Sequence, residues 1–110
     1  MVTELHSQED LDRLLEKSNS SPVLIFKHST QCSISAAADE EVTKFAETAS
    51  QVEIGIVLVI ENRPLSDSVA KQLDIYHQSP QLILVKDKHS IWKVSHWSIT
   101  ADAIAAAIKS

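Results

Sequence analysis

Two apolar runs of strand length enclose a segment of helical periodicity, and this pattern constrains the fold most strongly. The runs are Val23–Lys27 and Val52–Ile60, and the second is apolar on both faces, as is typical of a central strand in a parallel sheet. The segment between them places a row of apolar residues on one helical face: Ile34, Ala38, Val42, Phe45 and Ala49. The pattern therefore predicts a strand–helix–strand unit.

The flanking segments add one helix before this unit and a helix, a hairpin and a last helix after it. Each of these helices has an apolar face, at Leu11–Leu15, Leu65–Leu73 and Ala103–Ile108. Each follows a residue whose side chain can cap a helix N-terminus: Ser7, Asn62 and Thr100. The hairpin consists of two predicted strands and a polar turn, which are Gln81–Val85, Ile91–Val94 and Lys86–Ser90.

This order of elements predicts an α/β protein. A strand–helix–strand unit followed by a hairpin and a helix gives a mixed sheet with helices on both faces. We expect a central mixed four-stranded sheet flanked by helices on both faces, with an N-terminal helix, in a single domain over residues 1–110. The arrangement resembles the thioredoxin-like fold.

The composition argues against several classes of protein. The 110 residues carry 10 basic and 15 acidic side chains, for a formal net charge of −5, which is unfavourable for a general nucleic-acid binder. No apolar run approaches the roughly 20 residues of a membrane span, and the first residues lack the basic and apolar regions of a signal peptide. A single cysteine excludes an intrachain disulfide framework, so we expect a protein of the reducing cytoplasm.

The one cysteine, Cys32, lies between the predicted strand that ends at Lys27 and the helix that begins near Ser33. A thiol at a helix N-terminus feels the positive end of the helix dipole and unpaired backbone N–H groups. Both stabilise the thiolate, which is the reactive form. No acidic residue occurs from Ser21 to Ala38, so no carboxylate nearby in the sequence opposes the thiolate. The alternative is that Cys32 is an inert buried thiol. Its position at the strand–helix junction favours a reactive thiol instead.

The residue three positions after Cys32 is Ser35 rather than a second cysteine. Its hydroxyl can hydrogen-bond the sulfur or the backbone, or it can serve simply as a good early-helix residue. A mixed disulfide at Cys32 has no internal thiol to resolve it and therefore needs an external one.

Three sequence blocks of the chain form a set that is recognisable by its residues and their spacing: Phe26–Ser35, His77–Gln81 and Ser95–Thr100. Together they resemble the YtxJ-type monothiol bacilliredoxins, the bacilliredoxin C group of the thioredoxin-like superfamily, and the likeness spans essentially the whole chain. Ser33 departs from the pattern, because the family usually has proline there. Proline at the first helical position presets φ and has no N–H to satisfy, so Ser33 leaves an additional donor and a looser turn.

The resemblance implies a thiol–disulfide oxidoreductase that removes bacillithiol from mixed disulfides on cytoplasmic proteins. Cys32 would attack the bacillithiol sulfur, and a second bacillithiol, as thiol co-substrate, would clear the adduct. The resemblance implies no bound cofactor, and a separate NADPH-dependent flavin disulfide reductase would reduce the oxidised bacillithiol. In the superfamily, the loop that corresponds to Ser79-Pro80 is a cis-proline loop that pairs with an extended substrate. An ordinary trans turn is the alternative.

The candidate catalytic residues are Cys32 and Ser35. The candidate substrate-binding residues are Lys27, His28, Thr30, His77, Ser79 and Pro80. Bacillithiol carries a malate, so Lys27, His28 or His77 could pair with its carboxylates. The histidines match no compact metal motif, and no metal site is expected. We expect Trp92 and Trp97 to be packing residues.

Two other functions stay open from the sequence. The chain could be a non-catalytic thioredoxin-like binding or redox-sensor module whose Cys32 is only S-thiolated under stress, and Ser33 lends weight to that hypothesis. It could also bind an iron–sulfur cluster in a thiol-ligated dimer, as some monothiol glutaredoxins do. Turnover separates an enzyme from a sensor, because a sensor forms at most one equivalent of mixed disulfide.

Overall fold

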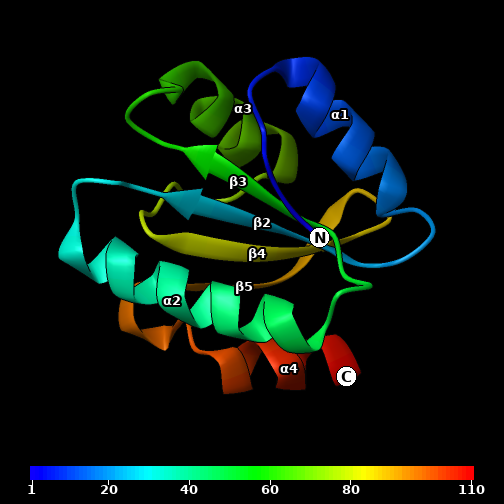
Figure 1. Ribbon diagram of the computed structural model, residues 1–110. Coiled ribbons are helices and arrows are strands. Elements are labelled where there is room, and N and C mark those ends of the chain that lie inside the picture. The colour runs from blue at the N-terminus through cyan, green and yellow to red at the C-terminus, as the bar shows by residue number, and fades with distance from the viewer.

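The computed structural model describes residues 1–110. The strands are β1 (Val2–Glu4), β2 (Val23–His28), β3 (Ile54–Leu58), β4 (Gln81–Lys86) and β5 (His89–Ser95). The helices are α1 (Gln8–Lys17), α2 (Ser33–Thr48), α3 (Arg63–Leu73) and α4 (Ala101–Lys109), with a short 3₁₀ turn, η1 (His96–Ser98), before α4. The strands form one five-stranded sheet in the order β1-β3-β2-β4-β5 (Figure 1).

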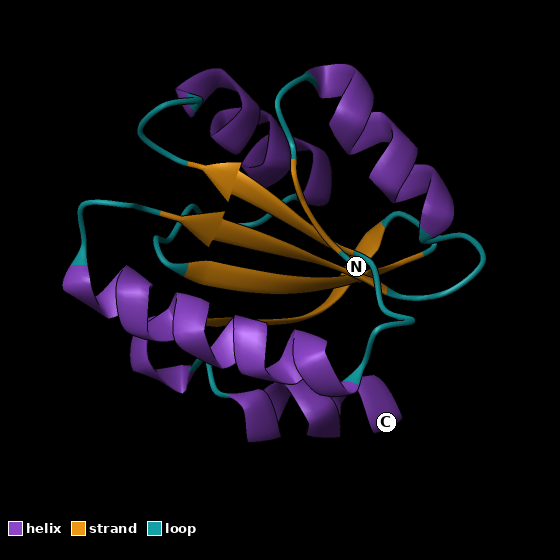
Figure 2. Cartoon of the chain, viewed as in Figure 1, coloured by secondary structure: helices purple, strands orange, loops and turns teal.

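Helices cover both faces of the sheet, with α1 and α3 on one face and α2 and α4 on the other (Figures 1 and 2). Each face has its own core cluster of 12 buried residues. Side chains alternate along β2, so that Val23 and Ile25 belong to the first cluster whereas Leu24 and Phe26 belong to the second. Burial on both faces explains why the first four residues of this strand, Val23 to Phe26, are all apolar.

Strand β2 is paired on both of its edges, and its register positions the end of the strand. It is parallel to β3, with Phe26 opposite Ile56, and antiparallel to β4, with Lys27 opposite Gln81. The carboxyl end of β2 therefore lies beside the start of β4, and both meet the beginning of α2 at one end of the sheet (Figure 1).

The sheet has five strands rather than the expected four. The additional strand, β1, pairs in parallel with β3 through only three residues, and all three are exposed. A segment this short, with no buried face, has no apolar alternation that could reveal it in the sequence.

The hairpin turn is tighter than the expected Lys86–Ser90. Only Asp87 and Lys88 lie between the strands, with φ values of 52° and 65°. Positive φ at both central residues is typical of a type I′ turn, which usually contains glycine or asparagine. Ser18 holds the turn instead, because its carbonyl accepts from the Asp87 N–H at 2.8 Å and its hydroxyl from the Lys88 N–H at 2.9 Å.

The three expected helix caps are confirmed. The side chains of Ser7, Asn62 and Thr100 each accept a hydrogen bond from a backbone N–H in the first turn of α1, α3 and α4 respectively. These contacts satisfy donors that have no partner inside the helix.

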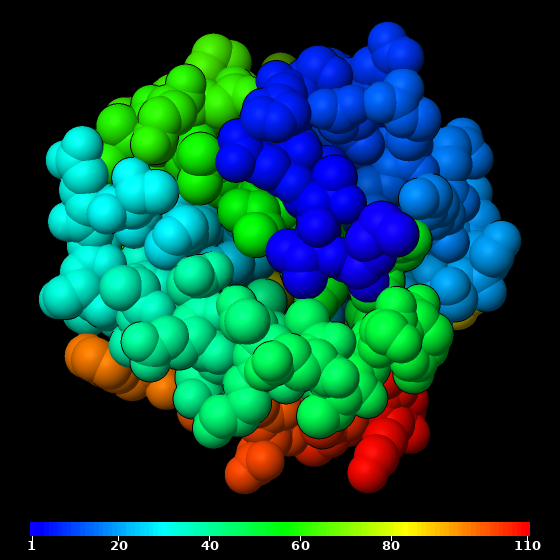
Figure 3. Space-filling view, in the orientation of Figure 1, coloured from blue at the N-terminus to red at the C-terminus, as the bar shows by residue number.

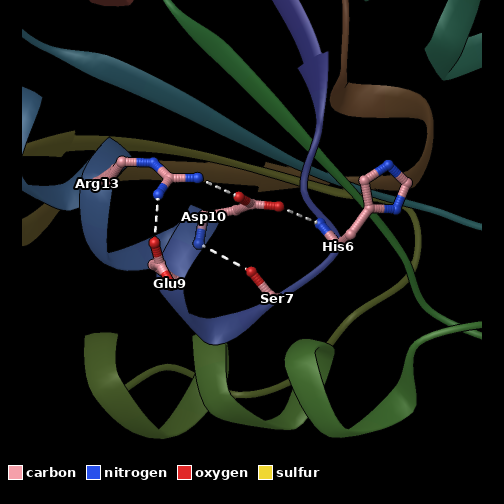
Figure 4. A network of polar contacts seen from close by, with 5 residues as sticks. All are labelled: His6, Ser7, Glu9, Asp10 and Arg13. Carbon is pink, nitrogen blue, oxygen red and sulfur yellow. Dashed lines mark hydrogen bonds and ion pairs between the residues drawn. The ribbon is translucent and has the colours of Figure 1, made fainter.

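The start of α1 carries a network of polar contacts (Figure 4). Ser7 Oγ accepts from the Asp10 N–H at 3.1 Å, and the Asp10 carboxylate accepts from the His6 N–H at 2.9 Å. Arg13 pairs with both Asp10 and Glu9. The His6 N–H is the main reason that the pKa of Asp10 lies below its usual value, although burial opposes the shift. The network fixes where the chain turns from β1 into α1.

We predict that Ser7→Ala lowers the free energy of unfolding by about 1 kcal/mol, because the Asp10 N–H loses its acceptor. Urea denaturation measures the change. Ser21→Ala is the matched control, since Ser21 is exposed and its hydroxyl makes no hydrogen bond within the chain. Equal stability of the two variants would contradict the role of the cap.

Candidate functional site

Cys32 is the N-cap residue of α2, a helix of 16 residues, and its thiol is free and half-buried. Its backbone is extended, with φ −120° and ψ 125°, and its side chain makes no capping hydrogen bond. The first turn of α2 contains no acidic residue. The positive end of a long helix dipole therefore lies at Cys32, and no residue of the first turn brings a negative charge to it.

The Ser35 hydroxyl is completely buried and joins the end of β2 to the start of α2. It accepts from the Ser29 N–H at 2.9 Å and lies 2.6 Å from Nδ1 of His28. Because the hydroxyl already accepts from Ser29, it can donate its own proton to His28. No hydrogen bond joins it to the Cys32 sulfur. Ser35 therefore holds the loop that carries Cys32 rather than contacting the thiol through a hydrogen bond.

His28 is held on a second side by an aromatic contact. Its ring stacks on Phe26, with centroids 5.2 Å apart and an interplanar angle of 24°. Phe26 belongs to the core cluster under α2 and α4, so the imidazole rests on a rigid support. The ring is half-buried, and its position at the end of β2 places it at the same edge of the sheet as Cys32.

The Ser79–Pro80 loop lies at this edge as well. The peptide bond between the two residues is cis, and the Pro80 carbonyl accepts from the His96 N–H at 3.1 Å. Neither the N–H nor the carbonyl of Ser79 takes part in a backbone hydrogen bond within the chain. The register that places Gln81 opposite Lys27 brings the loop next to the end of β2.

Lys27 is completely buried, and its Nζ lies 2.7 Å from Nδ1 of His77. Burial lowers the pKa of Lys27 from its usual 10.5 to about 8, with the charge of Asp67 acting in the opposite direction. Burial, followed by the positive charge of Lys27, also lowers the pKa of His77. The expectation that Lys27 pairs directly with substrate carboxylates needs correction, because a fully buried ammonium group presents no surface to a ligand.

Thr30 is exposed, and its hydroxyl donates to a carboxylate oxygen of Glu61 at 3.1 Å. Glu61 follows β3 and is distant in the sequence. The sequence argument that carboxylates are kept away from the thiol therefore holds only for the segment around Cys32. Only the parallel pairing of β2 and β3 brings this acidic group to the loop.

The structure forms two side-chain pairs from the expected site residues, Ser35 with His28 and Lys27 with His77. The sequence reasoning did not identify Gln81, which lies opposite Lys27, or Arg63, whose positive charge lowers the pKa of His77. It was also wrong about Trp97, whose exposed fraction is 69%. Trp92, in contrast, packs against a core cluster as expected.

The three main cavities of the molecule are lined by residues other than Cys32, His77 and Ser79. A cavity of about 420 Å³ lies along the β1 edge of the sheet, between β1, α1 and the start of β3. In Figure 3 the N-terminal segment lies beside and over part of β3 in this region.

No group of three or more His, Cys, Asp or Glu side chains is arranged to hold a metal ion. None of the helices has the length and apolar character needed to span a membrane.

Comparison with known proteins gives a family for the chain and relatives that share its fold. A family model described as "Monothiol bacilliredoxin BrxC" matches residues 3–104. One solved structure superposes with a TM-score of 0.87 and 28% identity over 96% of this chain and 92% of that one. Its description names a thioredoxin fold and assigns an oxidoreductase role only provisionally.

Two thioredoxins share the fold at lower identity. Thioredoxin from Fasciola hepatica has a TM-score of 0.76 and 17% identity, over 97% of this chain and 96% of that one. Mitochondrial thioredoxin 3 from Saccharomyces cerevisiae has a TM-score of 0.74 and 21% identity, over 98% and 93%. These similarities confirm the expected thioredoxin-like fold.

We predict that Ser33→Pro raises the free energy of unfolding by about 0.4–1 kcal/mol. Proline lowers the conformational entropy of the unfolded chain, and the folded backbone at this position already suits it. Ser33 is the first residue of α2, its N–H makes no backbone hydrogen bond, and Cys32 already has the extended backbone that precedes proline. Urea denaturation measures the gain. Ser33→Ala removes the hydroxyl without restricting φ and serves as the control, and a lower stability of the proline variant would contradict the prediction.

Proposed function

This chain belongs to the monothiol bacilliredoxin family, and we propose that it removes bacillithiol from protein mixed disulfides through Cys32. The observation that carries the proposal is a single free cysteine at the N-terminus of a long helix, at the same edge of the sheet as the Ser79–Pro80 loop. A lone thiol can exchange with a disulfide, but it cannot resolve the product internally. The chemistry therefore needs a small thiol to complete the cycle.

The first step is an exchange at sulfur. The Cys32 thiolate attacks the bacillithiol sulfur of the mixed disulfide, a new disulfide bond forms, and the old one breaks. The protein cysteine leaves as a thiolate and takes a proton from water. The product is a disulfide between Cys32 and bacillithiol.

The second step restores the thiol. The thiolate of a second bacillithiol attacks the bacillithiol sulfur bound to Cys32, which releases Cys32 as a thiolate and forms oxidised bacillithiol. A separate flavin disulfide reductase then reduces this product with electrons from NADPH. Bacillithiol is thus a co-substrate, and the chain itself holds no cofactor in this scheme.

The protein substrate binds along the Ser79–Pro80 loop. The unpaired N–H and carbonyl of Ser79 are suited to pair with an extended segment that carries the mixed disulfide. Thr30 and Gln31, which precede Cys32, are exposed, so a client protein can approach the thiol from this side. The clients are cytoplasmic proteins in this proposal, because a lone free cysteine suits a reducing compartment.

The other site residues position the reacting groups. Ser35 holds the loop before α2, and His28 and His77 present imidazole nitrogens at the same edge of the sheet. In this proposal the two histidines and Thr30 contact bacillithiol. Lys27 contributes through His77, because its own side chain is buried.

We predict that Cys32→Ser abolishes removal of bacillithiol, since a hydroxyl is a far weaker nucleophile than a thiolate. The test uses a protein with one bacillithiolated cysteine, excess bacillithiol and the flavin reductase, and follows loss of the adduct by mass spectrometry. The wild-type chain should release many equivalents of client thiol. Equal release by both proteins would overturn the proposal.

A redox sensor would give a different result in the same assay. It would release at most one equivalent of client thiol and stop as a mixed disulfide at Cys32. Such a single turnover in excess bacillithiol would contradict an enzymatic role. Comparing Ser33→Pro with Ser33→Ala then shows whether the residue after the cysteine limits the rate.

A further inference from the structure

Lys27 is the only charged side chain among the buried residues. Burial of an ammonium group opposes folding unless hydrogen bonds and opposite charges compensate for the lost water. Here the compensation is small, because Nζ has one hydrogen-bond partner, Nδ1 of His77 at 2.7 Å. A buried charge with so little support is better explained by a role in the site than by a contribution to stability.

Groups around Lys27 come from β4, β3 and α3, and α1 covers the same face of the sheet with the apolar side chains of Leu11, Leu14 and Leu15. Gln81 of β4 lies directly opposite, and its buried Oε1 has no hydrogen-bond partner. The β3 neighbour, Val57, is apolar. From α3, the charge of Asp67 raises the pKa of Lys27, whereas the charge of Arg63 lowers the pKa of His77.

The hydrogen bond to Lys27 determines the tautomer of His77. An ammonium group can only donate, so Nδ1 accepts, and the neutral ring carries its proton on Nε2. His77 is exposed and lies on the loop that leads to Ser79-Pro80. Its Nε2–H is therefore free to donate to a ligand at the edge of the sheet where Cys32 lies.

We propose that Lys27 is a positioning residue that acts through His77 to recognise a carboxylate on the small thiol. The buried ammonium group holds the ring in one tautomer and one orientation and places a positive charge behind the Nε2–H donor. The exposed Arg63 adds a second positive charge near the same ring. A donor supported by cations prefers a carboxylate ligand to a neutral amide ligand.

This inference rests on the proposed function, because it assumes that the small thiol carries a carboxylate. The protonation states support it. Burial lowers the pKa of Lys27 to about 8 and lowers the pKa of His77 below its usual 6.5. Near neutral pH the lysine is charged and the imidazole is neutral, as the hydrogen bond requires. Above about pH 8 the lysine loses its charge, and the preference for an anion should decline.

The test measures how fast Cys32 exchanges with a matched pair of small disulfides. One is 3,3′-dithiodipropionate, which carries carboxylates, and the other is its diamide, which has nearly the same shape and no charge. The ratio of the two rate constants cancels changes in the nucleophilicity of Cys32. Lys27→Met and His77→Phe are compared with the wild-type chain and with Lys71→Met, which removes an exposed lysine near the end of α3.

We expect the preference for the carboxylate disulfide to fall about tenfold in Lys27→Met, as for loss of a charge-assisted hydrogen bond. His77→Phe should show the same loss, and the double variant should lose no more than either single variant. The wild-type preference should decline as the pH rises through about 8, and the Lys27→Met ratio should not. Lys71→Met should retain both the preference and its pH dependence.

A ratio unchanged in both variants would overturn the inference, as would an equal slowing of both probes. This outcome leaves the proposed function intact, because exchange and turnover with bacillithiol are measured separately. Conversely, the two variants can change the ratio of rate constants even if the wild-type chain does not turn over with bacillithiol, and only the proposed function would then fail. Two peptide mixed disulfides identify the source of the carboxylate. In one, the small thiol carries the carboxylate; in the other, an aspartate next to the client cysteine carries it. Preference only for an aspartate next to the client cysteine would overturn recognition of the small thiol.

Stability separates this role from a structural one. The folded protein holds the Lys27 proton more weakly than the unfolded chain, whose lysine pKa stays near 10.5. Between about pH 8 and 10.5 the unfolded chain binds more protons, so the free energy of unfolding rises with pH. Lys27→Met should remove this rise and leave the protein equally or more stable at pH 7. A clear loss of stability at pH 7 would support a structural role instead.

Discussion

The pairing of β2 on both of its edges is the constraint on which the site depends. Hydrogen bonds to β3 on one edge and to β4 on the other determine both the register and the end of this strand. The cysteine, the start of α2 and the Ser79–Pro80 loop consequently meet at one end of the sheet. A shift of one residue in the register would exchange the two faces of β2 and take Lys27 away from His77.

The site divides its polar side chains between the two faces of the sheet. His28 and Ser35 lie on the side of α2, where Phe26 and the α2–α4 core support them. Lys27 and His77 lie on the side of α3. Alternation along a strand requires this division, because neighbouring residues point to opposite faces. Groups from both layers therefore lie at the end of the sheet where Cys32 is found.

The buried lysine has a cost in stability that the role we propose for it would explain. An apolar residue at position 27 would suit the core under α1 and α3, which is otherwise formed by Leu, Val and Ile. A charged residue there weakens that core, and the oxygen of the neighbouring Gln81 side chain has no hydrogen-bond partner either. Strained or poorly compensated groups of this kind are typical of functional sites, where the surrounding packing can tolerate the local cost.

The sequence by itself determined the order of the main elements, three helix caps and the position of the single cysteine at a helix N-terminus. These features depend on local patterns: apolar periodicity, a capping side chain, and a cysteine at a strand–helix junction. The tertiary structure alone decided the pairing of β1, the tight turn held by Ser18, the approach of Glu61 to Thr30 and the burial of Lys27 against His77. Each of these contacts joins residues distant in the chain, so its energy depends on strand register and packing rather than on neighbouring residues.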